Sequence, residues 1–308
     1  MRVLVLGAGA TGGYFGCRLV ESGQSVRFLV RPARAASLAR DGLRVQSARG
    51  DFARVVEASA SIEPGETFDL VLLSCKAWDL ESAIAAIAPA IGADTRILPL
   101  LNGLRHLDRL DAEFGRGRVL GGLCHISVAL QGDGSIRHVG SLDRLQFGDR
   151  DGCAVPARVR DGLLSMRTET CENTAILDAM WAKFAFIAGL AGITCLLRGS
   201  VGEIAATPDG AILATHLYHE CAETARQSGH APSDAAIAEA LTVLTAQGSP
   251  LKASMLRDLE RGSRTEVEHV LGDLLARAQA LQVDAPLLAA ACTALRVRER
   301  ALADASTA

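Results

Sequence analysis

The clearest hydrophobic pattern in the chain lies in its first 31 residues. A short apolar run at residues 3–6 (VLVL) is rich in β-forming side chains and is typical of a buried strand. A helical pattern follows from residue 10 to about residue 22, and Gly23 supplies a helix stop. Residues 26–30 form a second strand pattern. The pattern therefore predicts a strand–helix–strand unit at the start of the chain.

A glycine-rich motif of the form G-x-G-x-x-G joins the first strand to the helix. It consists of Gly7, Ala8, Gly9, Ala10, Thr11 and Gly12. Gly7 permits a tight turn, Gly9 lets the backbone approach a pyrophosphate, and Gly12 lets helix and strand pack closely. The pyrophosphate would rest on amide groups at the helix N-terminus. The motif alone is weak in a chain with 30 glycines, but its position favours dinucleotide binding over a nucleotide-free α/β domain.

The residue at the end of the second strand bears on the choice of dinucleotide. An acidic residue there would bind the ribose 2′-hydroxyl of NAD, whereas this chain has Arg31. Arg34 follows in a loop that we expect to begin at Pro32. Guanidinium groups suit a 2′-phosphate, so the sequence favours NADP. The alternative is that both arginines are solvated surface residues.

Two polar residues follow further buried strands. Lys76 comes after a strand at residues 68–74, and Asn102 after one at residues 96–101. Ligands bind at the carboxyl ends of parallel strands, so we expect both residues to point into the crevice of the glycine loop. Asp79 is expected to cap the helix that runs to about residue 88. Two shorter strands are expected at residues 43–46 and 54–57.

The pattern changes after residue 119. Short strands with glycine-rich connections predict antiparallel pairing at the edge of the sheet; they span residues 119–130, 135–139 and 144–147. A helix at 155–166 and a last strand at 169–171 follow, and the remaining pattern is helical. The sequence thus predicts a Rossmann-type α/β domain at residues 1–170 and an all-helical domain at residues 171–308.

The second domain opens with an apolar helix at residues 173–198, for which Asn173 is the expected N-cap and Gly199 the stop. Lys183 lies in its middle, and the chain has only three lysines among 32 basic residues. A buried lysine is costly unless it is paired or used, and unlike arginine it can lose its proton. The alternative is a lysine whose ammonium reaches the surface.

A second polar segment follows a short helix that opens at Ser254 and stops at Gly262. Ser263 and Glu266 have the spacing of a capping box at the start of the next helix. Spacing alone leaves the choice between a cap and a site role for Glu266 open.

Composition excludes several classes of protein. A net charge of −3 without a basic run gives no reason to expect a nucleic acid partner. No apolar run is expected to span a bilayer, so we expect a cytoplasmic protein without a membrane partner. The eight cysteines form no C-x-x-C motif, and we expect them to be reduced thiols. His216 and His219 share a predicted helix face, but no metal site is expected, because no third ligand is evident.

These features together resemble the ketopantoate reductase (2-dehydropantoate 2-reductase) family along essentially the whole chain. The similarity rests on the GAGATGG loop, the K-A-W after a strand, Asn102-Gly103, the W-x-K that ends at Lys183, and the S-M-x-x-D-x-x-x-G-x-x-T-E-x-E of residues 254–268. The resemblance implies NADPH-dependent reduction of a 2-oxo acid to a 2-hydroxy acid, and 2-dehydropantoate reduction in pantothenate biosynthesis first of all. It also implies a 6-phosphogluconate dehydrogenase-like C-terminal domain and an active site between the domains.

The resemblance also implies roles for individual residues. Lys183 matches the general acid, Asn102 the asparagine near substrate and nicotinamide, and Glu266 the acid beside the substrate hydroxyl. Ser254 matches a serine that binds substrate. Arg31 and Lys76 match cofactor-binding positions.

One departure from the family concerns the helix that carries Lys183. The family commonly has asparagines four and eight residues after the lysine, whereas this chain has Ile187 and Ala191. Such a row spans about 12 Å along one helix face, so both residues are expected to border the substrate. A relative that acts on a more apolar 2-oxo acid and a non-catalytic NADP-binding sensor are therefore alternatives. The sequence leaves the choice of monomer or homodimer open.

Overall fold

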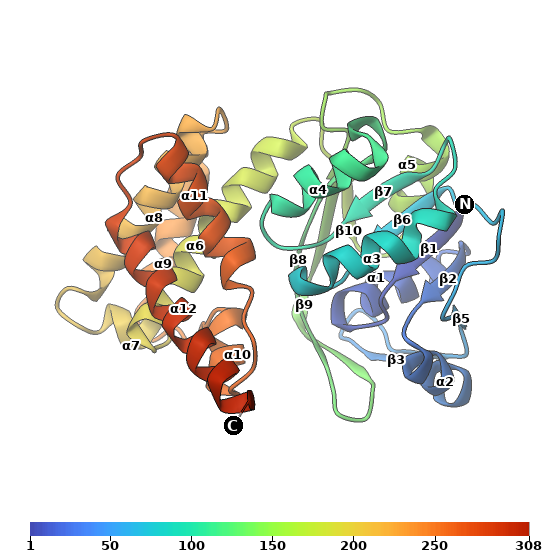
Figure 1. The fold of residues 1–308 in the computed structure, drawn as a ribbon, viewed down its shortest axis with the longest axis horizontal. Coiled ribbons are helices and arrows are strands. Elements are labelled where there is room, and N and C mark those ends of the chain that lie inside the picture. Colours follow the sequence, from blue (N-terminus) through green and yellow to red (C-terminus); the bar gives the residue numbers. More distant parts are fainter. Residues whose placement is uncertain (308) are drawn as a thin grey trace. The chain divides into compact units, whose positions relative to one another are not determined.

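The computed structural model describes residues 1–307, and the side chains of residues 1–302. The chain divides into two compact units (Figure 1). The first contains Met1–Leu101 and His106–Ile176, and the second contains Asn102–Arg105 and Leu177–Ala308. The expected α/β unit followed by a helical unit is confirmed. The short segment Asn102–Arg105 belongs with the helical unit although it follows a strand of the first.

A parallel five-stranded sheet forms the centre of the first unit. Its strands, in spatial order, are β5 (Glu57–Ser59), β2 (Ser25–Leu29), β1 (Arg2–Leu6), β6 (Leu70–Leu73) and β7 (Arg96–Pro99). Val3 of the central strand pairs with Val26 on one side and Leu70 on the other. All four residues of β6 are buried, as expected for a strand covered on both faces.

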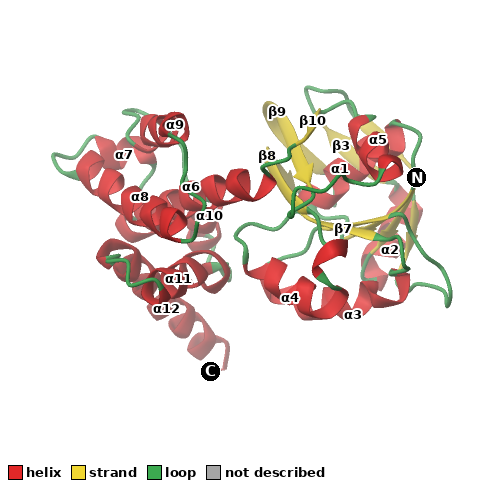
Figure 2. Cartoon of the chain, turned by 90° about the horizontal axis from the view of Figure 1, so that it is seen from above, coloured by secondary structure: helices red, strands yellow, loops and turns green. Residues whose placement is uncertain are grey.

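Helices cover both faces of this sheet. Figure 2 shows α3 and α4 on one side of the strands and α1 and α5 on the other. The helices of the unit are α1 (Ala10–Glu21), α2 (Pro32–Asp41), α3 (Leu80–Ile87), α4 (Arg105–Phe114) and α5 (Ala157–Leu164). The prediction of a helix after the glycine motif is confirmed.

The glycine-rich strands after residue 119 pair antiparallel as expected, but most of their residues belong to a second sheet rather than to the edge of the first. Only Val119 meets that edge among the described pairings, through an isolated parallel bridge to Ile97 of β7. The long strands β8 (Gly121–Leu130) and β9 (Ile136–Gly148) pair antiparallel. The same sheet contains β3 (Leu43–Gln46), β4 (Phe52–Arg54) and β10 (Glu169–Glu172). Helix α1 contacts strands of both sheets. Its buried Tyr14 donates a hydrogen bond of 2.9 Å to Asp143 of β9, which connects the two layers.

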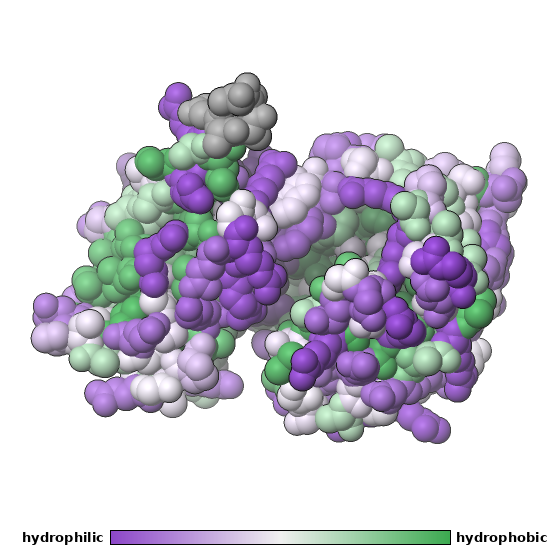
Figure 3. Space-filling model, turned by 90° about the horizontal axis from the view of Figure 1, so that it is seen from below, coloured by the Kyte–Doolittle hydropathy of each residue, from purple (hydrophilic) through white to green (hydrophobic). Residues whose placement is uncertain are grey.

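The second unit consists of helices within the described residues. They are α6 (Ile176–Leu197), α7 (Val201–Ala205), α8 (Gly210–Gln227), α9 (Asp234–Leu244), α10 (Ser254–Glu260), a π-helical turn η4 (Glu268–Gly272), α11 (Asp273–Ala280) and α12 (Pro286–Thr307). The predicted stop after α10 is confirmed, because Gly262 has a φ of +68°. Exposed large apolar side chains such as Ile212 and Val297 come from separate helices. The surface in Figure 3 accordingly mixes hydrophobic and hydrophilic residues.

Asn173 does not act as the N-cap of α6, because that helix begins at Ile176. The side-chain amide of Asn173 instead donates to Gln146 at 2.8 Å, and its oxygen accepts the amide of Ala175 at 2.9 Å. Asn173 therefore fixes the chain to β9 before the helix starts.

Helix α6 is long and apolar enough to cross a membrane by length and composition, contrary to the sequence-based expectation. However, 67% of its most apolar window is buried inside the protein. Residues such as Phe184, Ala185 and Ala188 have at most 1% exposure. A helix that is apolar all round and covered by its neighbours is a core helix of a folded unit.

Candidate functional site

The glycine loop of the first unit has the shape that a bound diphosphate needs. Gly7 has a φ of +91°, and a Cβ atom there would lie 2.6 Å from the Ser74 carbonyl oxygen. A Cβ on Gly12 would lie 2.2 Å from the Gly7 carbonyl oxygen. These two glycines are therefore required by the turn and by its packing.

The middle glycine of the motif, Gly9, has free space beside it. A Cβ on Gly9 would meet no atom within 4 Å, so the space beside this backbone is available to a ligand. Gly9 is also the N-cap of α1 and provides no side-chain bond to the first turn. Exposed backbone amides at a helix N-terminus bind phosphate groups. The residues present therefore fit the diphosphate of a dinucleotide.

Arg31 and Lys76 follow strands on either side of β1. The Arg31 side chain is 81% exposed and forms an ion pair of 2.8 Å with Asp79. The Lys76 ammonium lies 5.4 Å from the centre of the Trp78 ring. Asp79 occupies the N-cap position of α3 without a side-chain cap bond, so its expected capping role is wrong. Its carboxylate binds Arg31 instead.

Arg34 is not in a loop, because Pro32 begins helix α2 and the expected loop there is wrong. Proline suits the first helical turn, since its missing N–H has no partner in that position. The Arg34 guanidinium donates to the carbonyl oxygens of Ala8 at 3.1 Å and Gly134 at 3.0 Å. Arg34 thus connects the glycine loop to the turn between β8 and β9.

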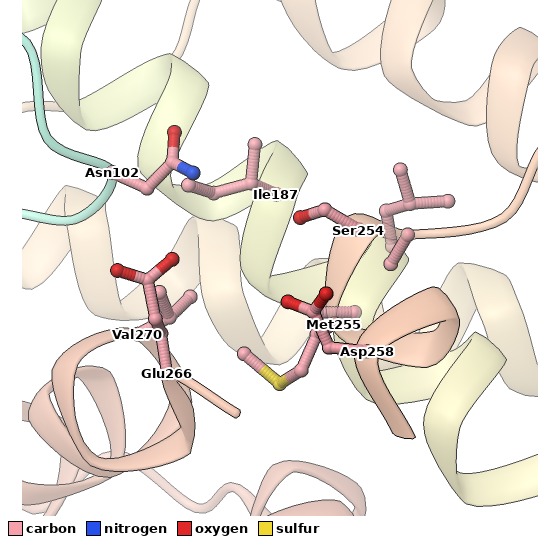
Figure 4. Close-up of a pocket in the computed structure, with 10 residues that line it drawn as sticks. Asn102, Ile187, Ser254, Met255, Asp258, Glu266 and Val270 are labelled. Atoms are coloured by element: carbon pink, nitrogen blue, oxygen red, sulfur yellow. The ribbon is translucent and has the colours of Figure 1, made fainter. Parts of the chain in front are cut away.

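A separate cavity lies within the helical unit (Figure 4). Its polar lining residues are Asn102, Ser254, Asp258 and Glu266, and its apolar ones are Ile187, Leu190, Ala191, Ala253, Met255 and Val270. Figure 4 shows the carboxylates of Asp258 and Glu266 and the hydroxyl of Ser254 facing the same space. These ten described residues include two carboxylates and no basic side chain.

Three helical segments position this lining. Ser254 and Asp258 lie one turn apart on α10, so both side chains face one side of that helix. Ile187 and Ala191 lie one turn apart on α6. Val270 belongs to the π-helical turn η4, a rare element that is frequent at functional sites.

Glu266 lies two residues before that π-helical turn. Its backbone oxygen accepts the amides of His269 and Val270, both at 3.1 Å. The preceding Thr265 donates its amide (2.7 Å) and its hydroxyl (2.8 Å) to Glu299 of α12. The N-cap position of the turn is Val267, without a side-chain cap bond. Glu266 therefore lines the cavity, and the segment before the turn is held by α12.

Asn102 reaches the cavity through contacts with the same turn. Gly103 has a φ of +76°, and a Cβ atom there would lie 2.7 Å from the His269 carbonyl oxygen. The His269 imidazole is hydrogen-bonded to the Asn102 backbone, and burial lowers the pKa of His269. The close approach of the two backbones requires a glycine after Asn102 and explains the Asn-Gly pair of the sequence.

Lys183 is not among the residues that line this cavity. It is half-buried, rather than buried as expected. It lies on α6 one turn before Ile187, so the two side chains share a helix face. The structure thus groups Asn102, Ser254, Glu266, Ile187 and Ala191 around the cavity, and Lys183 is outside this lining.

Sequence reasoning missed Asp258 and the apolar lining residues Leu190, Ala253, Met255 and Val270. Asp258 had a detectable signal, because it lies four residues after Ser254 on the same predicted helix. The other four belong to apolar patterns that are indistinguishable from core packing.

Among the described residues, His216 and His219 belong to no group of three His, Cys, Asp or Glu side chains that could hold a metal ion. The neighbouring Glu220 instead accepts the amides of Leu287 (3.1 Å) and Leu288 (2.8 Å) at the start of α12. Burial raises the pKa of Glu220. Glu220 is therefore a helix cap supplied by another helix.

Comparison with known proteins identifies the family. The family models described as "Ketopantoate reductase PanE/ApbA" and its "C terminal" part match residues 3–152 and 175–299. The chain belongs to the ketopantoate reductase family. It is an oxidoreductase of this family.

Three proteins illustrate the similarity. The "Uncharacterized oxidoreductase YkpB" of Bacillus subtilis (strain 168) is 38% identical and covers 94% of this chain and 95% of its own. A 2-dehydropantoate 2-reductase from Geobacter metallireducens GS-15 has a TM-score of 0.86 at 27% identity and covers 96% and 99% of the two chains. A ternary structure of D-mandelate dehydrogenase with NADH and anilino(oxo)acetate has a TM-score of 0.85 at 20% identity and covers 98% and 99%. This last likeness concerns the fold.

Proposed function

We propose that the protein is an NADPH-dependent reductase that converts a 2-oxo acid to a 2-hydroxy acid. The observation that supports this most directly is the cavity of the helical unit, which brings together Asn102, Ser254 and Glu266 from distant parts of the sequence. These are the residues that the family resemblance assigns to substrate. The first unit supplies the second requirement, a glycine loop that fits a diphosphate.

The cofactor is held by the first unit in this proposal. Gly7, Gly9 and Gly12 with their backbone amides hold the diphosphate, and Arg31 and Lys76 neutralise the 2′-phosphate. When bound, the nicotinamide supplies the hydride for the reduction. NADPH rather than NADH follows from Arg31, which stands where an acidic residue would select NAD.

The chain's own residues handle the proton and the substrate. Lys183 donates a proton from Nζ to the carbonyl oxygen, so that the negative charge created by hydride addition does not persist. The side-chain amide of Asn102 orients that oxygen, and Glu266 accepts a hydrogen bond from the hydroxyl that forms. Ser254 binds the substrate by its hydroxyl. Lys183 then recovers its proton from water, which completes the cycle.

The apolar wall of the cavity favours a substrate with an apolar tail. Ile187, Leu190, Ala191 and Val270 present methyl and methylene groups, and burying such surface against a hydrocarbon tail is favourable. D-mandelate dehydrogenase has the same fold, and its name gives an aromatic 2-hydroxy acid, mandelate, as its substrate. The second candidate substrate is 2-dehydropantoate, an intermediate of pantothenate biosynthesis. Relatives such as the Geobacter protein are named as reductases of this compound.

A non-catalytic NADP sensor remains the competing class. The presence of Lys183 together with the polar residues of the cavity argues against it, because a sensor does not need a proton donor. We also propose a cytoplasmic location, because 67% of the most apolar window of α6 is buried inside the protein, as in a core helix.

The deciding experiment follows NADPH consumption by its absorbance with a panel of 2-oxo acids. The panel contains 2-dehydropantoate and 2-oxo acids with branched aliphatic or aromatic tails. Reduction of at least one member to its 2-hydroxy acid supports the proposal. Tight NADPH binding without turnover of any member would instead support the sensor.

A further inference from the structure

Arg31 and Asp79 form an ion pair across the carboxyl end of the parallel sheet. Nη2 of Arg31 lies 2.8 Å from Oδ1 of Asp79. Arg31 follows β2, Asp79 follows β6, and the sheet order places β1 between these strands. The pair therefore reaches across the end of the strand that carries the glycine loop.

The Asp79 carboxylate is not needed by its own helix. Asp79 occupies the N-cap position of α3, yet its side chain makes no cap bond. The hydroxyl of Ser82 binds the backbone oxygen of Asp79 at 2.8 Å. An aspartate in this position ordinarily accepts backbone amides of the first turn. Here the carboxylate is directed to Arg31, which the proposed function assigns to the cofactor.

The pair can exchange partners readily. The side chains of Arg31 and Asp79 are 81% and 31% exposed, and exposed ion pairs contribute little to stability. A guanidinium group also has five N–H donors, so Arg31 can bind a phosphate while Asp79 stays close. A ligand at this end of the site therefore meets a cation and an anion together.

The two dinucleotides differ in what they present to such a pair. NADPH carries a 2′-phosphate, which Arg31 attracts and Asp79 repels. NADH carries a 2′-hydroxyl, which can donate a hydrogen bond to a carboxylate. We propose that Asp79 is a second determinant of cofactor selectivity, which limits the preference for NADPH set by Arg31 and allows NADH to bind. This inference rests on the proposed function, because it requires the dinucleotide to bind at the glycine loop.

The experiment compares Asp79→Asn with the unaltered protein by calorimetric titration. Adenosine 2′,5′-bisphosphate and 5′-AMP serve as probes of the adenosine end, followed by NADPH and NADH. Asp79→Asn should tighten the bisphosphate and NADPH about 1.5-fold to fivefold, the range expected for one exposed charge pair. It should weaken NADH, because the 2′-hydroxyl exchanges a charged carboxylate acceptor for the weaker neutral amide oxygen of asparagine. The asparagine has nearly the same shape, so the fold is retained.

Glu81→Gln is the matched control. Glu81 is also exposed on α3, but it binds Arg109 at 2.9 Å. The Glu81→Gln substitution also removes one negative charge near the start of α3. It should leave the ratio of NADPH affinity to NADH affinity within about twofold of the value for the unaltered protein.

The outcomes separate this inference from the proposed function. Equal changes in the ratio for both variants, or weaker NADPH binding in Asp79→Asn, would overturn the role of Asp79. If the unaltered protein binds neither dinucleotide, the proposed function fails as well. If it binds and reduces a 2-oxo acid while Asp79→Asn leaves the ratio unchanged, only the role of Asp79 fails.

Discussion

The guanidinium of Arg34 donates a hydrogen bond of 3.1 Å to the carbonyl oxygen of Ala8, inside the glycine loop. The same Nη2 atom donates to Gly134 at 3.0 Å. Arg34 lies on α2 and Gly134 lies in the turn between β8 and β9, so one side chain connects three parts of the first unit. This relationship makes Arg34 a positioning residue for the loop.

Replacing Arg34 with alanine should therefore loosen the glycine loop. Two charge-assisted hydrogen bonds are lost, each contributing about 1.5–3 kcal/mol at most. We expect a lower midpoint of thermal unfolding and weaker dinucleotide binding. Arg40→Ala on the same helix is the control, because Arg40 is exposed and pairs with the adjacent Asp41. Equal effects of the two variants in calorimetry would contradict a positioning role for Arg34.

Lys183 can be tested by comparing two substitutions. Lys183→Met should lower kcat by about 10²–10⁴ with little effect on NADPH binding, because the proton donor is removed. Lys183→Arg keeps the positive charge but not a removable proton, so it should be nearly as slow. Lys252→Met is the control, since Lys252 pairs with Glu260 on α10. Near-normal turnover in Lys183→Arg would show that Lys183 acts only by its charge.

Glu220 predicts a specific dependence of stability on pH. Burial raises the pKa of its carboxyl group in the folded protein, and the amides of Leu287 and Leu288 only partly oppose this effect. An acid whose folded pKa is raised contributes most to stability below its ordinary pKa, and the contribution is lost as pH rises through the folded value. The stability advantage of the unaltered protein over Glu220→Gln should therefore shrink as the pH rises through this window.

Denaturant titrations of both proteins at several pH values measure that difference. Glu220→Gln also loses one of two oxygen acceptors at the start of α12, which costs about 0.5–2 kcal/mol at every pH. The change of this free-energy difference with pH is separate from that constant cost. An advantage that grows with pH would mean that the helix amides hold the carboxylate ionised, contrary to the prediction.

The parts of this structure that sequence could predict are those governed by neighbouring residues. The strand, glycine loop and α1 follow from the local pattern, and so does the end of α10 near Gly262. The prediction that the side chains of Asp79 and Asn173 cap helices is wrong, because their partners Arg31 and Gln146 are distant in the sequence. Local capping rules cannot include such partners.

Glu266 and the second sheet also show that local sequence rules do not include contacts between distant residues. The capping-box spacing of Ser263 and Glu266 is genuine, but Glu299 of α12 holds the intervening Thr265. The structure does form a capping box at Ser200 and Glu203, at the start of α7. Strand β9 of the long hairpin pairs with β3 in the second sheet, and the chain meets the parallel sheet at the Ile97–Val119 bridge before β8. These outcomes depend on tertiary contacts, which periodicity does not encode.

The substrate preference should depend on the apolar wall of the cavity. Ile187 and Ala191 occupy positions where the family commonly has asparagines, and both line the cavity. A polar substrate that needs those amides would lose about 1–3 kcal/mol for each unpaired group. A hydrocarbon tail would gain about 25 cal/mol for each Å² that it buries. We therefore expect at least one apolar-tailed 2-oxo acid to match or exceed 2-dehydropantoate in kcat/KM.

Ile187→Asn tests the wall directly, with Ile187→Val as its control. The asparagine restores an amide at the cavity and should shift the ratio of kcat/KM values toward 2-dehydropantoate, whereas valine keeps the wall apolar and should leave the ratio unchanged. A fall in kcat/KM for all substrates together would report only lost packing, because Ile187 is half-buried. The ratio removes that common factor. The contrary outcome has two parts. The unaltered enzyme prefers 2-dehydropantoate about a hundredfold, a difference of roughly 2.7 kcal/mol, and Ile187→Asn only lowers the turnover of that substrate. In that case another residue supplies the missing hydrogen bonds, and the apolar wall does not set specificity.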